Sequence, residues 1–334
     1  MNANTNRRID IDCAKGLGIF LVVLGHLVAK NQPLGNAWYT LLQTGIYTFH
    51  MPFFVFLSGY VAFMTGSGDT PPKGWLKLFG RRAERLLLPF VLFGMLLFTG
   101  KLLAAQFIYV DNRPHLNWES MLNLVWNTDN SPAISIWYMY VIFLASVVTP
   151  ILVWLARGSR LLALAASAVL FLVGMPHQLF MDRFAEFYLF FMLGALAADA
   201  GERWTSFVDR YRWVTLGALG AALWVLFSIQ RFSPHWSHLL CGALSLAALH
   251  GLVRWKPLAN SKLLLFLGTY SFVIYLLNTP AIGLAKGILI KWVPWDGPTF
   301  VIHALLLLVS GILVPVLIKQ WIFKRWRYLD RLTN

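Results

Sequence analysis

The fold class is decided by residues Phe300–Phe323, which read FVIHALLLLVSGILVPVLIKQWIF and carry one charge, at Lys319. A helix of roughly 20 apolar residues crosses the hydrocarbon core of a bilayer, which is about 30 Å thick. The rest of the chain has the same character, since 58% of its 334 residues are hydrophobic and 13% are charged. This composition leaves too little polar surface for a soluble protein and predicts an integral membrane protein.

Apolar runs of similar length recur along the rest of the chain between charged residues and turns. We therefore expect an all-α, polytopic integral membrane helix bundle with about ten transmembrane helices. Residues 1–334 are expected to form a single membrane-embedded domain. The predicted spans are Gly16–Ala29, Gly45–Thr65, Leu86–Phe107, Ile134–Ala156, Leu161–Met175, Arg183–Ala200, Trp213–Ile229, Trp236–Val253, Leu263–Ile282 and Phe300–Phe323.

An even number of spans places both termini on one side of the membrane. With a cytoplasmic N-terminus, the inner segments hold 20 of the 28 Lys and Arg residues, as the positive-inside rule requires. Both termini are therefore predicted to be cytoplasmic, and the net charge of +14 reflects orientation in the bilayer, so no nucleic acid partner is expected. Cys13 and Cys241 match no metal-ligand spacing, so no metal is expected either.

Ionisable side chains inside spans are costly, by about 3 kcal/mol on insertion scales, and each one suggests a function. Asp12 and Lys15 lie at the inner end of the first span, and His26 lies toward its outer end. Lys15 and His26 are eleven residues apart, which brings them within about 20° of the same helical face and roughly 16 Å apart. A long ligand lying along this helix would contact both.

Further ionisable residues are predicted near the outer ends of other spans. His50 lies at a depth similar to that of His26, so the two histidines suit an acid/base pair, although His50 alternatively only hydrogen-bonds a carbonyl before Pro52. Glu186 opens the sixth span. His238 lies beside an outer loop and carries little signal, and His250 is interpreted as a satisfied histidine near the inner end of its span.

Aromatic and basic residues add two weaker patterns. Trp137 and Tyr138 open the fourth span, where aromatic rings either pack or stack on a sugar. Arg82 and Arg85 are three residues apart on a helix and either set topology or bind the phosphates of a cytosolic ligand.

Five stretches together resemble one known family, the acyltransferase 3 membrane family. They occur in the family's order and are Asp10–Gly16 with Lys15-x10-His26, Phe49–Phe54 followed by Leu57–Tyr60, Arg82–Leu86 with Pro89, Ile136–Met139, and Gly268–Ser271 through Ile274–Leu276. The resemblance implies a ten-helix membrane O-acyltransferase that moves an acyl group, usually acetyl, from cytosolic coenzyme A to a hydroxyl of a carbohydrate acceptor. His26 matches the family's essential histidine and Lys15 its basic partner.

These inferences assign a role to each candidate residue. The expected catalytic residues are His26, His50 and Glu186, with His26 as general base. Lys15, Arg82 and Arg85 are expected to hold acetyl-CoA. The expected substrate contacts are Asp12, Ser58, Trp137, Tyr138, Tyr275 and Asn278.

The chain departs from the family at two positions. Lys15 stands where Arg is frequent, and Lys makes no bidentate phosphate contact. Asn278 follows the Ile-Tyr-Leu motif where many members have a histidine, and it can only hydrogen-bond.

A transporter is the main alternative, because transporters also bind substrates through buried polar residues on interrupted helices, but no inverted repeat is visible. A non-enzymatic scaffold leaves Lys15 and His26 on one face unexplained. We expect a multi-pass protein of a bacterial inner membrane that acts on exopolysaccharide, O-antigen or a lipid-linked sugar. The sequence leaves the acceptor's identity and the oligomeric state open.

Overall fold

The computed structural model describes residues 8–29, 31–108, 110, 113–127, 130–229 and 233–333. This part of the chain is helical and contains no β-strand, only an isolated bridge between Asn127 and Gln178. The all-α class is therefore confirmed. Arg7, Lys30 and Arg231, which entered the charge comparison above, lie outside the described residues.

The helices have the following bounds in chain order. They are α1 Ile9–Gly25, α2 Ala37–Met64, η1 Pro72–Gly74, α3 Trp75–Arg82, η2 Ala83–Leu87, α4 Leu88–Ala104, α5 Trp118–Leu122, η3 Ile134–Ile136, α6 Trp137–Leu155, α7 Arg160–Val173, α8 Met181–Ala200, α9 Glu202–Ile229, α10 Pro234–Val253, α11 Lys256–Ala259, α12 Lys262–Leu289, η4 Gly297–Thr299, α13 Phe300–Trp321, η5 Phe323–Arg325 and α14 Arg327–Leu332. The predicted outer loop between the third and fourth predicted spans contains the short helix α5.

Seven helical segments of the described chain are long and apolar enough to cross a membrane. They are Ala37–Met64, Pro72–Ala104, Ile134–Leu155, Glu202–Ile229, Pro234–Val253, Lys262–Leu289 and Gly297–Arg325.

Three of the ten predicted spans fall on helices outside this group. Helices α1 and α7 have 17 and 14 residues. Helix α8 has 20 residues but carries four charged ones, Asp182, Arg183, Glu186 and Asp199. The chain is thus an all-helical membrane protein, while the count of ten spans and the side of the termini stay predictions.

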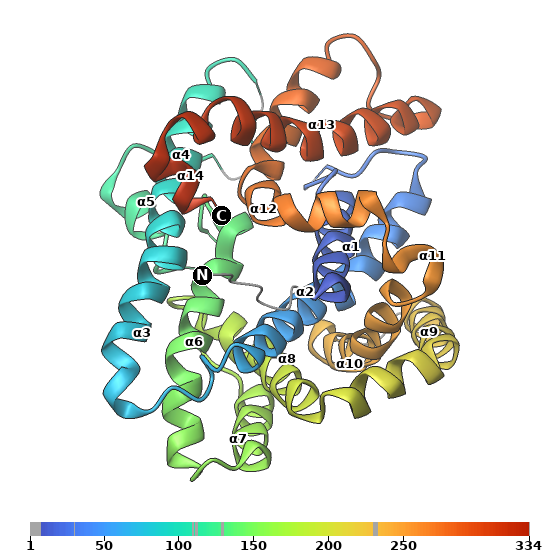
Figure 1. Ribbon diagram of the computed structural model, residues 1–334. Coiled ribbons are helices and arrows are strands. Elements are labelled where there is room, and N and C mark those ends of the chain that lie inside the picture. Colours follow the sequence, from blue (N-terminus) through green and yellow to red (C-terminus); the bar gives the residue numbers. More distant parts are fainter. Residues whose placement is uncertain are drawn as a thin grey trace.

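The most extensive contacts between helices are those of α1 with α12 and of α2 with α8 (Figure 1). Helix α12 lies between α1 and α13, and α2 packs against α1, α8 and α10. Helices α9 and α10 form one edge of the bundle, and α6 and α7 lie at another. The core between them is filled by side chains such as Phe53, Phe190 and Tyr188, which are almost fully buried.

Helices α1 and α12 cross at two glycines with their backbones in close contact. A Cβ atom at Gly16 would lie 2.0 Å from the carbonyl oxygen of Leu264, and one at Gly268 would lie 2.0 Å from that of Asp12. Small residues permit such close approach between membrane helices. These glycines belong to the first and last of the sequence motifs, so both motifs have a packing function.

Helices α2 and α8 cross in the same way. A Cβ atom at Gly59 would lie 2.0 Å from the carbonyl oxygen of Phe191, and one at Gly194 would lie 2.2 Å from that of Phe56. The two crossings lie next to the predicted site residues Lys15 and Ser58. They fix α1 relative to α12 and α2 relative to α8.

Candidate active site

His26 lies directly after the last residue of α1. Its backbone amide still donates to the carbonyl oxygens of Val22 and Val23, at 3.0 and 3.1 Å, so the residue continues the direction of the helix. Its imidazole is half-buried, and its Nδ1 lies 2.9 Å from Oδ1 of Asn278 on α12. The structure thus brings together two predicted site residues from opposite ends of the chain.

The partners of Asn278 determine which nitrogen of His26 carries hydrogen. The Nδ2 group of Asn278 donates to the carbonyl oxygens of Ile274 and Tyr275, at 2.9 and 2.8 Å. Since that end of the amide faces two acceptors, the end that faces His26 is the acceptor Oδ1. His26 Nδ1 therefore donates its hydrogen, and the unprotonated nitrogen of the neutral ring is Nε2. A nitrogen in this state has the lone pair that a general base needs.

His50 is buried in the middle of α2, one turn after Tyr47. Its Nδ1 lies 2.8 Å from the carbonyl oxygen of Ile46. A carbonyl only accepts, so Nδ1 carries the hydrogen and Nε2 has the lone pair. The carbonyl contact considered as an alternative for His50 is present, and it leaves the second nitrogen available.

Tyr47 lies between the two histidines. The centroid of its ring is 6.3 Å from that of His26 and 5.3 Å from that of His50. Its hydroxyl donates to the carbonyl oxygen of Gly25 at 2.9 Å, on the residue immediately before His26. Tyr47 was not anticipated from the sequence, where it reads as one aromatic residue among many.

Glu186 on α8 contacts a histidine that the sequence analysis set aside. Its Oε1 lies 2.5 Å from Nδ1 of His238, and its Oε2 lies 3.5 Å from Arg183 Nη1. His238 lies within the first two turns of α10, inside the predicted span Trp236–Val253. One signal was available, because His238 precedes the buried Cys241 and Ser245 by three and seven residues, which is the spacing of one helix face.

Hydrogen bonds connect three of the predicted substrate contacts, Ser58, Tyr138 and Tyr275, in a second polar cluster. The hydroxyls of Ser58 on α2 and Tyr138 on α6 lie 2.5 Å apart. The backbone amide of Tyr138 donates to the hydroxyl of Tyr275 on α12 at 3.1 Å. Tyr275 also supplies one of the carbonyls that hold Asn278, so this group is connected to His26 through α12.

Trp137 borders the Glu186 side of the site. Its ring centroid lies 5.1 Å from that of Phe187, and the guanidinium of Arg183 lies 5.9 Å from the Trp137 ring. Phe187 in turn lies 5.6 Å from the ring of His238. Aromatic and charged groups therefore line the same part of the bundle, a combination that suits a sugar ring and its hydroxyls.

The residues predicted to bind acetyl-CoA lie in separate segments of the chain. Lys15 Nζ lies 3.7 Å from Asp12 Oδ1 on the same helix, whereas Arg82 Nη2 donates at 2.8 Å to Ser67 Oγ in the segment that follows α2. Arg85 lies within the π-helical turn η2 and is exposed, while Arg82 is half-buried. Arg82 and Arg85 thus have different surroundings, and a phosphate site shared with Lys15 stays a prediction.

An ion-pair network at the start of α1 was not predicted. Asp10 accepts from Arg8 and Arg254, at 2.9 and 2.8 Å, and His250 Nε2 lies 3.4 Å from its Oδ2. His250 Nδ1 accepts from the indole of Trp204 at 2.9 Å, so this histidine is satisfied, as the sequence suggested. Burial alone raises the pKa of Asp10, but hydrogen bonds from His250 and Arg8 outweigh it and hold this pKa far below its ordinary value.

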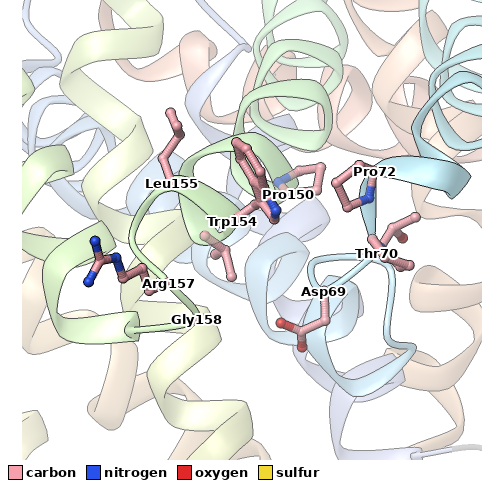
Figure 2. A pocket seen from close by; sticks show the side chains of 10 residues that line it. Asp69, Thr70, Pro72, Pro150, Trp154, Leu155, Arg157 and Gly158 are labelled. Atoms are coloured by element: carbon pink, nitrogen blue, oxygen red, sulfur yellow. The ribbon is translucent and has the colours of Figure 1, made fainter.

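Two hollows open at the ends of helices opposite His26. One, of about 660 Å³, is lined by Arg8, Asp10, Glu202 and Arg254 among others. The other, of about 620 Å³, lies where the turn after α6 faces the loop after α2. Figure 2 shows Trp154 and Arg157 on the α6 side and Asp69, Thr70 and Pro72 opposite them. Neither hollow is lined by His26 or its partners.

The described residues contain no group of three or more His, Cys, Asp or Glu side chains placed to hold a metal ion. The geometry around His26 and His50 suggests acid–base chemistry by imidazole, supported by amide, hydroxyl and carboxylate groups.

Comparison with known proteins decides the family. Residues 8–320 match the sequence profile of a family described as an acyltransferase domain. The chain belongs to the acyltransferase 3 family. This match extends over nearly the whole chain and confirms the resemblance that the sequence motifs indicated.

Two curated proteins to which the chain is similar are nodulation proteins named NolL. The protein from Mesorhizobium japonicum is 27% identical over 226 residues, which are 66% of this chain and 56% of that protein. The protein from Sinorhizobium fredii is 40% identical over 101 residues, which are 30% of this chain and 26% of that protein. The chain therefore spans about half, or less, of the length of the curated relatives it matches. No solved structure matches it.

In this member of the acyltransferase 3 family, separate motifs meet at one site. The first motif contributes His26, the second contributes Ser58, the Trp-Tyr-Met motif contributes Tyr138, and the late motif contributes Tyr275. Asn278, two residues after the late motif ends, connects that motif to His26.

Proposed function

We propose that this protein is a membrane O-acyltransferase that moves an acetyl or similar acyl group from cytosolic acyl-CoA to a hydroxyl of a carbohydrate acceptor. Membership of the acyltransferase 3 family supports the reaction class. The observation that carries the proposal is the His26–Asn278 hydrogen bond, because it leaves Nε2 of His26 as a base.

One histidine is sufficient for both proton transfers of this reaction. His26 Nε2 removes the proton of the acceptor hydroxyl as its oxygen attacks the thioester carbonyl carbon. The C–O bond forms, the C–S bond breaks, and the leaving thiolate of coenzyme A takes the proton from the imidazolium. His26 is then neutral again, and the products are the acyl ester and coenzyme A.

The other candidate residues have supporting roles in this proposal. Lys15, Arg82 and Arg85 bind the phosphates of the donor on the cytoplasmic side, and Asp12 orients Lys15. Trp137, Tyr138, Tyr275 and Ser58 contact the acceptor, and His50 supplies a second lone pair near the acceptor hydroxyl. A bacterial inner membrane gives the enzyme cytosolic acyl-CoA on one face and an exported or lipid-linked sugar on the other.

The test is release of coenzyme A thiol by purified protein in nanodiscs, with acetyl-CoA and a panel of glycans. We expect release by the wild type and by His115→Ala, whose histidine is exposed in the outer loop. We expect His26→Ala to fold and to lose the activity. A wild type that binds no acetyl-CoA and releases no thiol with any acceptor would instead support a transporter.

A further inference from the structure

Glu186 and His238 form a carboxylate–imidazole pair that joins α8 to α10. The distance from Glu186 Oε1 to His238 Nδ1 is 2.5 Å, and His238 Nε2 lies 3.1 Å from the carbonyl oxygen of Tyr47 on α2. The side chains of Glu186 and His238 are 16% and 14% exposed, so water screens them little. Three helices therefore meet at one histidine.

The partners of His238 set the number of protons that the pair holds. The Tyr47 carbonyl only accepts, so His238 Nε2 carries a hydrogen. At the other nitrogen, Nδ1 faces a carboxyl oxygen at hydrogen-bond distance, so one more proton lies between them. Imidazole is more basic than a carboxylate, so this proton lies on Nδ1 and the pair is an imidazolium beside a carboxylate.

Tyr47 connects this pair to His26. Its backbone carbonyl accepts from His238, and its side-chain hydroxyl donates to Gly25, the residue before His26. Five residues further along α2, Pro52 has no amide hydrogen, so the carbonyl of Thr48, the residue next to Tyr47, lacks its usual donor within the helix. His238 therefore contacts α2 beside an interruption of its hydrogen-bond ladder, and it holds Tyr47 from a second helix.

We propose that Glu186 and His238 act as a proton-sharing positioning pair, which holds Tyr47 against Gly25 and so keeps His26 in its reactive position. This inference rests on the proposed acyl transfer. His238 touches no reacting atom in it, and its effect on rate comes from geometry, because a shift of about 1 Å at a reacting group can cost roughly 100-fold in rate.

The kinetic test uses His238→Gln, Glu186→Gln and the double variant. Each single variant loses the shared proton, so we expect kcat to fall by 10- to 100-fold while KM for acetyl-CoA stays within about twofold of wild type. The double variant is expected to match the worse single variant, because both changes break one unit. Single variants within twofold of wild-type kcat, or losses that multiply, would overturn the proposal.

A matched control exists at the same end of α8. His177 Nδ1 lies 3.1 Å from Asp182 Oδ2, which is also a histidine–carboxylate pair, but the His177 side chain is 66% exposed and the pair does not contact Tyr47 in any hydrogen bond among the described residues. We expect His177→Gln to leave kcat within twofold of wild type. An equal loss in this control would mean that any charge near the outer surface affects the rate.

A spectroscopic measurement separates this inference from the proposed function. In protein labelled with ¹⁵N-histidine, the wild type should show an imidazole that is protonated at both nitrogens. This signal should disappear in His238→Gln, and in Glu186→Gln His238 should become a neutral ring. If the wild type shows the signal but releases no coenzyme A, the proposed function fails and the pair stands. If no doubly protonated ring is present, the pair itself is wrong.

Discussion

At the scale of single residues, an amide sets the tautomer of His26. Asn278 has both ends of its side chain committed, with Nδ2 bonded to two carbonyls and Oδ1 bonded to His26. An amide held in this way cannot rotate to offer its donor to the imidazole. The residue that departs from the family pattern is therefore suited to holding one tautomer of His26.

This leads to a graded prediction for Asn278. Asn278→Asp keeps an oxygen acceptor beside His26 Nδ1, whereas Asn278→Leu removes it and frees the ring to adopt the other tautomer. We expect kcat for coenzyme A release to fall roughly 100-fold in Asn278→Leu, within the 10²–10⁴ range that a positioned base contributes. Asn278→Asp should retain more activity than Asn278→Leu. Equal losses in two folded variants would contradict a role in tautomer selection.

Asp10 supports a second prediction at this scale, about stability. Its folded-state pKa is lowered, mainly by hydrogen bonds from His250 and Arg8 that outweigh the opposing effect of burial. The stabilisation is therefore fully present above the unfolded pKa of about 3.9 and is lost only as pH falls toward the lower folded value. We expect Asp10→Asn to lower the melting temperature by a constant amount from pH 8 to pH 5.

Glu202→Gln is the control for Asp10, because Glu202 lines the same hollow but is exposed. Its melting temperature should match that of the wild type throughout this pH range. If the difference between wild type and Asp10→Asn already shrinks between pH 8 and pH 6, the stabilisation has another source.

The sequence was informative about single residues where chemistry is local. His26 and Lys15 stood out because charged or ionisable groups are rare inside apolar runs. Asn278 was predicted as a substrate contact, but its bond to His26 was not, since the two residues are 252 positions apart in the chain and only helix packing brings them together. His238 was overlooked for a similar reason, because its importance depends on Glu186 and on the Tyr47 backbone, from two other helices.

At the scale of helices, equal spacing along two parallel helices aligns the site. Gly16 precedes His26 by ten residues, and Gly268 precedes Asn278 by ten, which is about 15 Å along each helix axis. Because α1 and α12 touch at these glycines and run in the same direction, the two polar residues reach the same height. The hydropathy pattern predicted where most helices lie but gave no information on which ones cross.

The close crossing of α1 and α12 predicts that the stability of the protein depends sharply on side-chain size at position 268. In Gly268→Ala the new Cβ atom would overlap a backbone oxygen of α1, which cannot move aside as a flexible side chain would. We expect a loss of stability of about 1–3 kcal/mol or more, and a lower yield of folded protein on size-exclusion chromatography. Gly283→Ala on the same helix has no atom within 4 Å of its new Cβ and should behave as wild type. Similar yields for the two variants would contradict the close crossing.

At the scale of the whole molecule, three helices that match predicted spans fall outside the group of seven that are long and apolar enough to cross a membrane, namely α1, α7 and α8. Helix α7 has 14 residues, or roughly 21 Å, against a hydrocarbon core of about 30 Å. Helix α8 has four charged residues, yet most of its central residues, from Phe187 to Met192, are buried by the bundle. Burial against other helices is what allows such a segment to lie at membrane depth.

The ten-span prediction requires α7 to connect the two sides of the membrane. Arg157, just before α7, and Met175, just after it, are both exposed and are suitable sites for single cysteines. With a membrane-impermeant maleimide added to intact cells, we expect Met175→Cys to be labelled and Arg157→Cys to be labelled only after the membrane is opened. The native Cys13 and Cys241 are buried and should give a low background. Labelling of both positions from one side would mean that α7 does not span the bilayer, and the side assigned to every later loop, including the outer position of Glu186 and His238, would have to be reversed.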